Sequence, residues 1–226
     1  MLIRNWMTRD PITVEPDTPM MDADHLMKEN KIRGLPVVKG KKLVGIVTDR
    51  DIKAASPSAA TTLDMHELLY LLAKIKVKEI MTKDPITICE DDTVEEAAVM
   101  MLRHKISHLP VLSEKKELVG LITETDIFKV LTILTGVYRG GVQFGFELED
   151  RSGSIKEVAD VIREFGGRMC SILTSYEDAR EGYRKVFIRV LNLDKKRLKE
   201  LQARLEKEFR VLYVVDSSEK KHIHGV

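Results

Sequence analysis

Residues 7–13 read MTRDPIT and residues 81–87 read MTKDPIT, so one stretch of the chain recurs with a single exchange of arginine for lysine. The alignment continues without a gap to KIRGLPV at 31–37 and KISHLPV at 105–111. After one inserted residue, LVGIVTDRDI at 43–52 aligns with LVGLITETDI at 118–127. Three matches in the same order indicate an internal duplication.

The periodicity of apolar residues changes in the same order within each repeat. A short strand is predicted at Ile12–Val14 and at Ile86–Ile88. A helix follows, which in the second repeat begins at Thr93 and has the apolar positions Ala97, Val99, Met100 and Met101. Two β-rich runs then form a hairpin, and a second helix opens at Thr-x-x-Asp. Each repeat is thus β-α-β-β-α, too small to bury both faces of its sheet alone, so we expect the two to pack together.

Composition shifts divide the chain into five parts. The first repeat covers residues 1–56 and the second covers 77–134, with a Ser/Pro/Ala-rich connector and a helix at Asp64–Lys76 inside a linker at 57–76. A different domain is predicted at 138–216, and a polar tail at 217–226.

The third domain begins with alternating apolar residues between Val142 and Leu148, which predict a half-buried strand. A helix ended by Gly166-Gly167, two strands at Met169–Tyr176 and Tyr183–Leu191, a second helix and a strand at Val211–Val215 follow. The order β-α-β-β-α-β is the ferredoxin-like arrangement. The predicted fold class is therefore mixed, α+β or α/β: a pseudo-symmetric pair of β-α-β-β-α repeats and then a ferredoxin-like domain.

Composition limits the possible partners. The chain has 226 residues, 43% of them hydrophobic, and a formal net charge of +1, so a strong non-specific hold on nucleic acid or on an anionic membrane is not expected. Two cysteines predict free thiols in a reducing cytoplasm. Neither a signal peptide nor an apolar run long enough for a membrane span is apparent.

The Thr-x-x-Asp motif at Thr48 and Asp51 and again at Thr123 and Asp126 has two interpretations. In the first, it caps a helix and satisfies free backbone N–H groups. In the second, the helix start receives a phosphate while the carboxylate accepts both hydroxyls of a ribose. Because the motif occurs in both repeats, recurrence does not separate the two.

The whole constellation resembles a tandem pair of CBS domains, also called a Bateman module, over roughly residues 1–132. That resemblance implies two clefts that bind adenosine-containing molecules, with an adenine nucleotide as a regulatory ligand and no catalytic cofactor. Carried over by position, the implied nucleotide-binding residues are Thr13, Val14, Arg33, Gly34, Leu35, Pro36, Thr48, Arg50 and Asp51 in the first repeat, and Thr87, Ile88, Ser107, His108, Leu109, Pro110, Thr123, Thr125 and Asp126 in the second.

The two repeats differ at polar positions. Arg33 of the first repeat aligns with Ser107 of the second, and Arg50 aligns with Thr125. Since phosphate needs cationic partners, the two clefts are expected to differ in phosphate capacity unless both arginines are simply solvated. For His108 we expect a hydrogen-bonded pocket or interface position, because no second metal ligand stands at a useful spacing.

The last domain resembles the ACT family, whose first helix opens at an Asp-x-x-Gly loop. The resemblance implies an amino-acid carboxylate at a loop made by Asp150, Ser152, Gly153 and Ser154. Because Arg168 stands where many members carry asparagine, dimerisation without a small ligand is an equal alternative.

Together these features predict a non-catalytic regulatory protein that binds an adenine nucleotide, forms a homodimer and acts on a metabolic enzyme, with no metal site. No Walker loop, nucleophile elbow, HExxH or CxxC motif is present to support an enzyme. The alternatives are an ACT-type regulator that responds to amino acids, and a nucleic-acid-binding CBS protein. The basic cluster at 195–199 favours the latter, but acidic residues on the same helix offset it.

Overall fold

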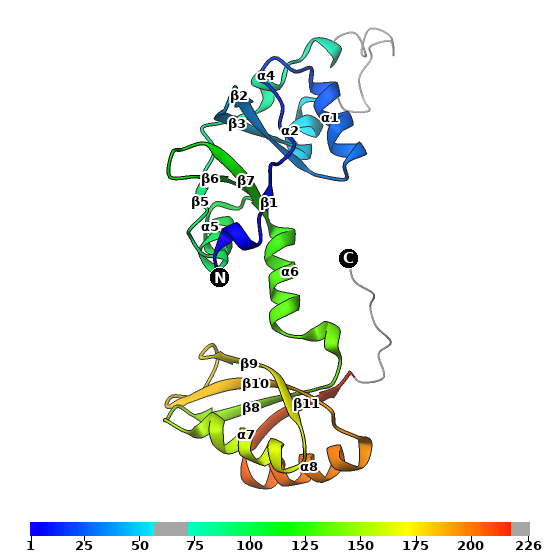
Figure 1. Cartoon of the computed structure of the whole chain (residues 1–226), viewed down its shortest axis with the longest axis vertical. Helices are drawn as coiled ribbons and strands as arrows, with labels where there is room; N and C mark the ends of the chain where they lie inside the picture. The colour runs from blue at the N-terminus through cyan, green and yellow to red at the C-terminus, as the bar shows by residue number, and fades with distance from the viewer. Residues whose placement is uncertain (57–71, 218–226) are drawn as a thin grey trace. The chain divides into compact units, whose positions relative to one another are not determined.

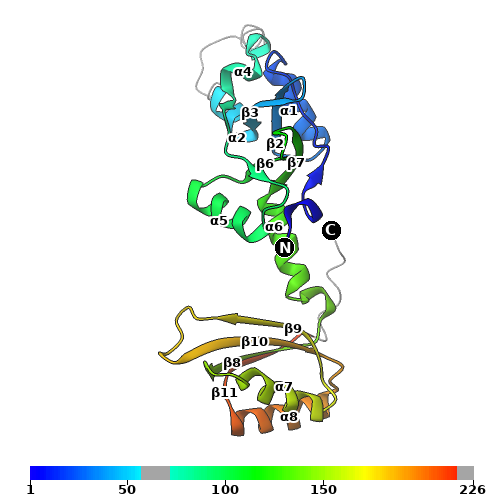
Figure 2. The same ribbon diagram turned by 60° about the vertical axis from the view of Figure 1, so that its left-hand side comes forward.

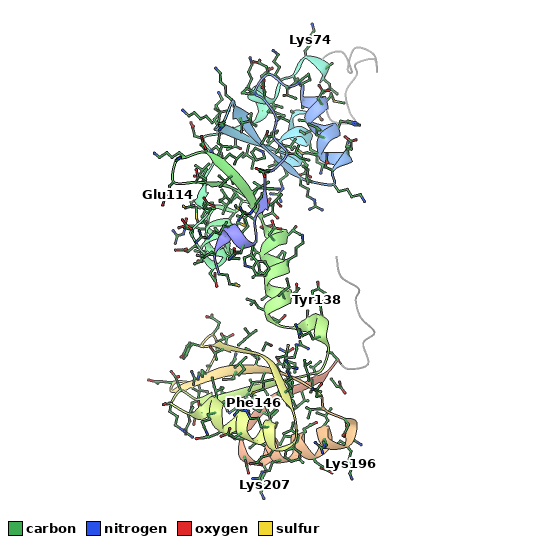
Figure 3. The ribbon with its side chains drawn as sticks, in the orientation of Figure 1. Lys74, Glu114, Tyr138, Phe146, Lys196 and Lys207 are labelled. Atoms are coloured by element: carbon green, nitrogen blue, oxygen red, sulfur yellow. The ribbon has the colours of Figure 1, made fainter. Side chains whose placement is uncertain are left out.

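Two hairpins form the frame of the duplicated half of the chain, as predicted (Figure 1). In a computed structural model that describes residues 1–56 and 72–217, β2 (Gly34–Lys39) pairs with β3 (Lys42–Thr48). In the second repeat β6 (His108–Leu112) pairs with β7 (Leu118–Thr123), with Glu114 at the hairpin tip (Figure 3). Both hairpins shift register at the same position, between Val37 and Val38 and between Val111 and Leu112. The shared irregularity reflects the duplication.

Helices flank each hairpin in the same order. The first repeat has α1 (Met20–Glu29) and α2 (Asp49–Ala55), and the second has α5 (Val94–His104) and α6 (Glu124–Leu134). The predicted start of α5 is confirmed: Thr93 and Glu96 form a capping box, in which the Thr93 N–H donates to the Glu96 carboxylate at 2.8 Å.

The repeats exchange their first strands. β1 (Thr8–Arg9), which follows a 3-10 turn at Ile3–Asn5, pairs with β7 of the second repeat. Reciprocally, β4 (Thr82–Lys83), which follows the short helix α4 (Val77–Ile80), pairs with β3 of the first repeat. The resulting sheets have the orders β1-β7-β6-β5 and β2-β3-β4. Each MTxDP segment therefore completes the sheet of the other repeat.

Two glycines make this exchange possible. A Cβ on Gly45 would lie 2.6 Å from the sulfur of Met81, and a Cβ on Gly120 would meet the sulfur of Met7 more closely still. Each methionine fills the space above the glycine of the opposite hairpin. This close approach is the physical reason for glycine in the two aligned LVG segments.

Three predictions for this half need correction or fall outside the described residues. Of the strand expected at Ile12–Val14, Val14 alone pairs, in a single parallel bridge to Val37, and the second strand is β5 (Ile88–Cys89). Val99 is 52% exposed, so it does not belong to the core face of α5 as Ala97 does. Most of the helix expected at Asp64–Lys76 lies outside the described residues.

The chain divides within α6, between Phe128 and Lys129, into two units. The second contains a 3-10 turn at Val137–Arg139, β8 (Val142–Glu149), α7 (Ser154–Glu164), β9 (Arg168–Ser175), β10 (Tyr183–Leu191), α8 (Lys195–Glu208) and β11 (Arg210–Asp216). Its antiparallel sheet has the order β11-β8-β10-β9, and both helices cover one face (Figures 1 and 2). The β-α-β-β-α-β order is the one predicted.

The core of this unit lies between the sheet and its helices. Phe144 and Phe146 stack with ring centroids 6.1 Å apart, and Phe146 is labelled in Figure 3. The prediction that β8 is half-buried is wrong, because Gly145 and Glu147 on its other face are buried too. The rings of Phe187 and Tyr213 stack on that face, and Tyr213 lies directly against Gly145. The glycine makes room for the tyrosine ring.

Candidate functional site

In the first repeat, three neighbouring chain segments bring the predicted binding residues together. The Val14 N–H donates to the carbonyl oxygen of Pro36 at 3.1 Å, which places residues 13–14 beside the Leu-Pro segment. Across the hairpin, Gly34 is the register partner of Thr48. The Asp49 N–H donates to the Arg33 carbonyl at 3.0 Å, so the start of α2 is fixed to the start of β2.

The second repeat reproduces this arrangement. Ile88 is the parallel partner of Val111, next to the Leu-Pro segment, and His108 is the register partner of Thr123. The Glu124 N–H donates to the Ser107 carbonyl at 3.1 Å. Both Leu-Pro segments are buried, whereas Arg50 and Thr125, between the motif residues, are exposed.

Both Thr-x-x-Asp motifs form the hydrogen bonds of a helix cap. In the first, the Thr48 N–H and hydroxyl each donate to Asp51 Oδ2 at 2.7 Å. In the second, the same groups of Thr123 donate to Asp126 Oδ2 at 2.9 and 2.7 Å. The capping interpretation is therefore confirmed at both repeats. It does not exclude the ribose interpretation, because the cap holds each half-buried carboxylate in one orientation at the end of a strand.

The repeats meet at Gly34 and His108, which occupy aligned positions. A Cβ on Gly34 would lie 2.9 Å from both Cδ2 and Nε2 of His108, and Ser107 Oγ lies 2.9 Å from Nδ1. Burial of the ring lowers the pKa of His108. Nearby charges act in both directions. The guanidinium of Arg33 lowers this pKa further, whereas three carboxylates raise it, those of Asp49, Glu124 and Asp126. His108 is an interface residue with a hydrogen bond to Ser107.

A pocket of about 420 Å³ lies between α1 and α2 of the first repeat. Of the predicted residues, it includes Arg33. Its lining is Asp24, Met27, Lys28, Lys31, Ile32, Arg33, Asp49, Ile52, Lys53 and Ser56. Lys28, Lys31 and Lys53 are not among the residues predicted from the sequence, although Lys28 and Lys53 align with apolar residues of the second repeat.

In the second unit, the four predicted loop residues lie at the start of α7. Gly153 is the N-cap with a φ of 89°, a backbone conformation that favours glycine. Arg184 from β10 reaches this loop: its guanidinium donates to Ser154 Oγ at 3.2 Å and lies 3.6 Å from Asp150. Nothing in the local sequence pointed to Arg184, because its approach depends on the pairing of β10 with β8.

Within residues 1–56 and 72–217, no group of three His, Cys, Asp or Glu side chains is arranged to hold a metal ion. In the same part of the chain, every helix is too short or too polar to cross a bilayer. Cys89 and Cys170 are free thiols.

Comparison with known families matches residues 3–58 and 77–133 to the CBS domain. These two matches coincide with the duplicated β-α-β-β-α repeats. The chain belongs to the CBS-domain family. The two matched repeats of this chain form a tandem CBS pair.

Relatives from other organisms match this half of the chain. An inosine-5'-monophosphate dehydrogenase of Korarchaeum cryptofilum is 44% identical over 124 residues, which is 55% of this chain but 23% of the dehydrogenase. The chain thus spans about a quarter of that relative's length. A CBS domain-containing protein of Dictyostelium discoideum is 34% identical over 58% of this chain and 90% of its own length.

Two solved structures share the arrangement. A Vibrio cholerae protein, provisionally assigned to acetoin utilization (AcuB), matches 62% of this chain and 96% of its own, with 32% identity and a TM-score of 0.51. CBSX2 of Arabidopsis thaliana matches 60% of this chain and 96% of its own, with 26% identity and a TM-score of 0.51. CBSX2 has also been solved in complex with AMP, a structure that matches with a TM-score of 0.48.

Proposed function

We propose that the CBS pair binds adenosine-containing ligands, with AMP, ADP, ATP, NAD and S-adenosylmethionine as the candidates, and that the chain is a non-catalytic regulator. The observation that carries the proposal is the paired arrangement of Asp51 and Asp126. Each half-buried carboxylate is held at a helix start, one strand away from a buried Leu-Pro segment. A ribose needs a fixed acceptor for its hydroxyls, and an adenine ring needs an apolar wall.

The solved complex of CBSX2 with AMP supports this assignment, because CBSX2 shares the paired architecture. The ligand acts by differential binding: it shifts the protein toward whichever arrangement of the repeats binds it more tightly. The output is a changed surface that a metabolic enzyme recognises. The V. cholerae neighbour makes acetoin utilization the first pathway to examine, by testing whether loss of the protein impairs growth on acetoin.

Calorimetry with the five ligands tests the binding proposal. The informative variants are Asp51→Asn and Asp126→Asn, because asparagine keeps an oxygen that accepts the capping N–H but removes the charge. Each variant is expected to weaken one site about tenfold, the loss of one charge-assisted hydrogen bond. Glu114→Gln, at the exposed hairpin tip, is the control. Failure of all five ligands to bind the unaltered chain would overturn the proposal.

For the second unit we propose an ACT-type domain with a ferredoxin-like sheet that responds to an amino acid. Arg184 supports this, because it brings a positive charge to the loop of Asp150 and Ser154 at the start of α7. An amino-acid carboxylate would find both the guanidinium and the helix N–H groups there. A thermal-shift screen of amino acids, repeated with Arg184→Gln, tests it, and stabilisation that survives the substitution would contradict this site.

A further inference from the structure

We propose that the pocket between α1 and α2 of the first repeat is a binding site for the phosphate groups of a polyphosphorylated small molecule. The pocket shares Arg33 with the first proposed adenosine cleft, and its other cationic residues lie outside the set predicted to bind a nucleotide. Its walls come from the C-terminal half of α1, the connection to β2, and α2.

The charge of the pocket favours an anion. Four cationic side chains line it, against two carboxylates, so that the lining carries a net charge of about +2 at neutral pH. Its cationic residues are Lys28, Lys31, Arg33 and Lys53.

Two of the four cations are already paired. Lys28 forms an ion pair with Asp24, and the Lys53 ammonium lies 2.9 Å from Asp49. The hydrogen bond from Lys53 lowers the pKa of Asp49, which therefore stays ionised. Lys31 and Arg33 form no ion pair with any residue in the described ranges, so these two side chains supply the excess charge. Two separate cations are matched by a ligand that carries negative charge on more than one phosphate group, as a di- or triphosphate does.

The same surface of the second repeat has a different chemistry. The alignment pairs Lys28 with Leu102, Arg33 with Ser107, Lys53 with Phe128 and Ser56 with Leu131. In the fold, Leu102 is 80% exposed and Phe128 63% exposed, so packing within a single copy of the chain does not dictate the residue type at these positions. Around this pocket, three cations of the first repeat thus stand where the second repeat has apolar or neutral residues. The corresponding surfaces of the two repeats therefore differ in charge.

Lys31 provides a selective test because its counterpart is also lysine. Lys31 and Lys105 both adopt a φ of 54°, a left-handed conformation that asparagine tolerates well. Lys31→Asn removes a charge from the basic pocket, whereas Lys105→Asn removes the same charge beside Leu102 and Ser107. The two substitutions are matched in backbone conformation, exposure and chemistry. They therefore differ only in the residues that surround the lost charge.

The experiment is calorimetric titration of the full chain with inorganic tripolyphosphate at fixed ionic strength. We expect binding that Lys31→Asn weakens about fivefold, the upper range for one exposed charge pair, and that Lys105→Asn leaves unchanged. No detectable binding at millimolar tripolyphosphate would overturn the proposal. So would an equal loss in both variants, which would indicate attraction to diffuse surface charge.

Titrations with AMP and ATP identify the source of the phosphate and rest on the proposed nucleotide function. If Lys31→Asn weakens ATP but not AMP, the pocket receives the tail of a nucleotide bound in the first cleft, next to Arg33. If it weakens tripolyphosphate and leaves ATP unchanged, the pocket serves a separate phosphorylated metabolite. Either result supports the pocket. Absence of any adenosine binding would defeat the proposed function while the tripolyphosphate result still decides the pocket.

Discussion

The imidazole of His108 lies against Gly34, the residue at the aligned position of the other repeat. A Cβ on Gly34 would come within 2.9 Å of two ring atoms, closer than side chains approach in folded proteins. The duplicated sequence therefore could not keep histidine, or any other large residue, at both positions. One repeat supplies the ring and the other supplies the space, so the pseudo-symmetry is broken where the repeats meet.

This relationship predicts the effect of Gly34→Ala. The added methyl group would displace the His108 ring, and overpacking of this kind costs about 1–3 kcal/mol of unfolding free energy. Chemical denaturation followed by the fluorescence of Trp6, the single tryptophan of the chain, measures it in the CBS pair. In the double variant Gly34→Ala with His108→Ala the clash is absent, so the two effects should not add. Additive losses would show that the ring and the glycine are not coupled.

His108 also predicts how the stability of the CBS pair depends on pH. Because burial lowers its pKa in the folded state, the unfolded chain binds a proton more readily. The contribution of the neutral imidazole to the unfolding free energy is therefore fully present above the unfolded pKa of about 6.5. It falls as the pH decreases through that value.

Denaturation at pH 7.5 and 5.5, again followed by Trp6, measures this dependence above the range in which carboxylates titrate. His108→Gln removes the titrating group, and we expect it to flatten the profile. An equally steep decrease in that variant would assign the pH dependence to other residues.

Much of this fold could be predicted from the sequence, because the signals are local. The hairpins, the start of α5 at Thr93 and the β-α-β-β-α-β order of the second unit follow from periodicity and capping. The exchange of β1 and β4 could not be predicted, since a two-residue strand has no periodicity and its partner lies in the other repeat. In retrospect, Gly45 and Gly120 marked the positions, but only the fold shows that Met81 and Met7 occupy the space above them.

The candidate site shows the same division. The helix caps that contain Asp51 and Asp126 could be predicted from the Thr-x-x-Asp spacing alone. The position of Arg33 beside Asp49 follows from the hairpin. The pocket between α1 and α2 was not predicted, because it depends on which face of α1 remains exposed. Arg184 was missed for a related reason: it reaches the α7 loop across a sheet pairing that connects residues far apart in the sequence.

In the second unit, a buried carboxylate predicts a large effect of one glutamate. Glu147 on β8 is 6% exposed, accepts a hydrogen bond from Arg180 Nε at 2.6 Å and forms an ion pair with Arg210, whose Nε lies 3.2 Å away. Glu147→Ala should destabilise the unit by about 1–3 kcal/mol, the range for a hydrogen-bonded group lost from a buried site.

Glu149, two residues along the same strand, is the control, because its ion pair with Arg151 is exposed to solvent. We expect Glu149→Ala to change the unfolding free energy by less than about 0.5 kcal/mol. Hydrogen exchange of peptides from β8 and β10 measures both variants without interference from the CBS pair. Equal protection in the two variants would contradict a structural role for the buried carboxylate.

The exposed apolar face of the second repeat predicts how two copies would associate. We propose a homodimer in which Leu102 and Val99 of α5 and Phe128 of α6 meet their counterparts in a second copy. These apolar side chains are 80, 52 and 63% exposed, and burial against a second copy would remove them from water. Contact with the first repeat of the partner is disfavoured, because Lys28 and Lys53 stand at the aligned positions there. An interface of like patches around a two-fold axis satisfies this constraint.

Light scattering at micromolar concentration tests this arrangement. We expect a dimer that Leu102→Glu dissociates and Lys28→Glu leaves intact. A monomeric unaltered chain, or equal dissociation by both substitutions, would refute the arrangement.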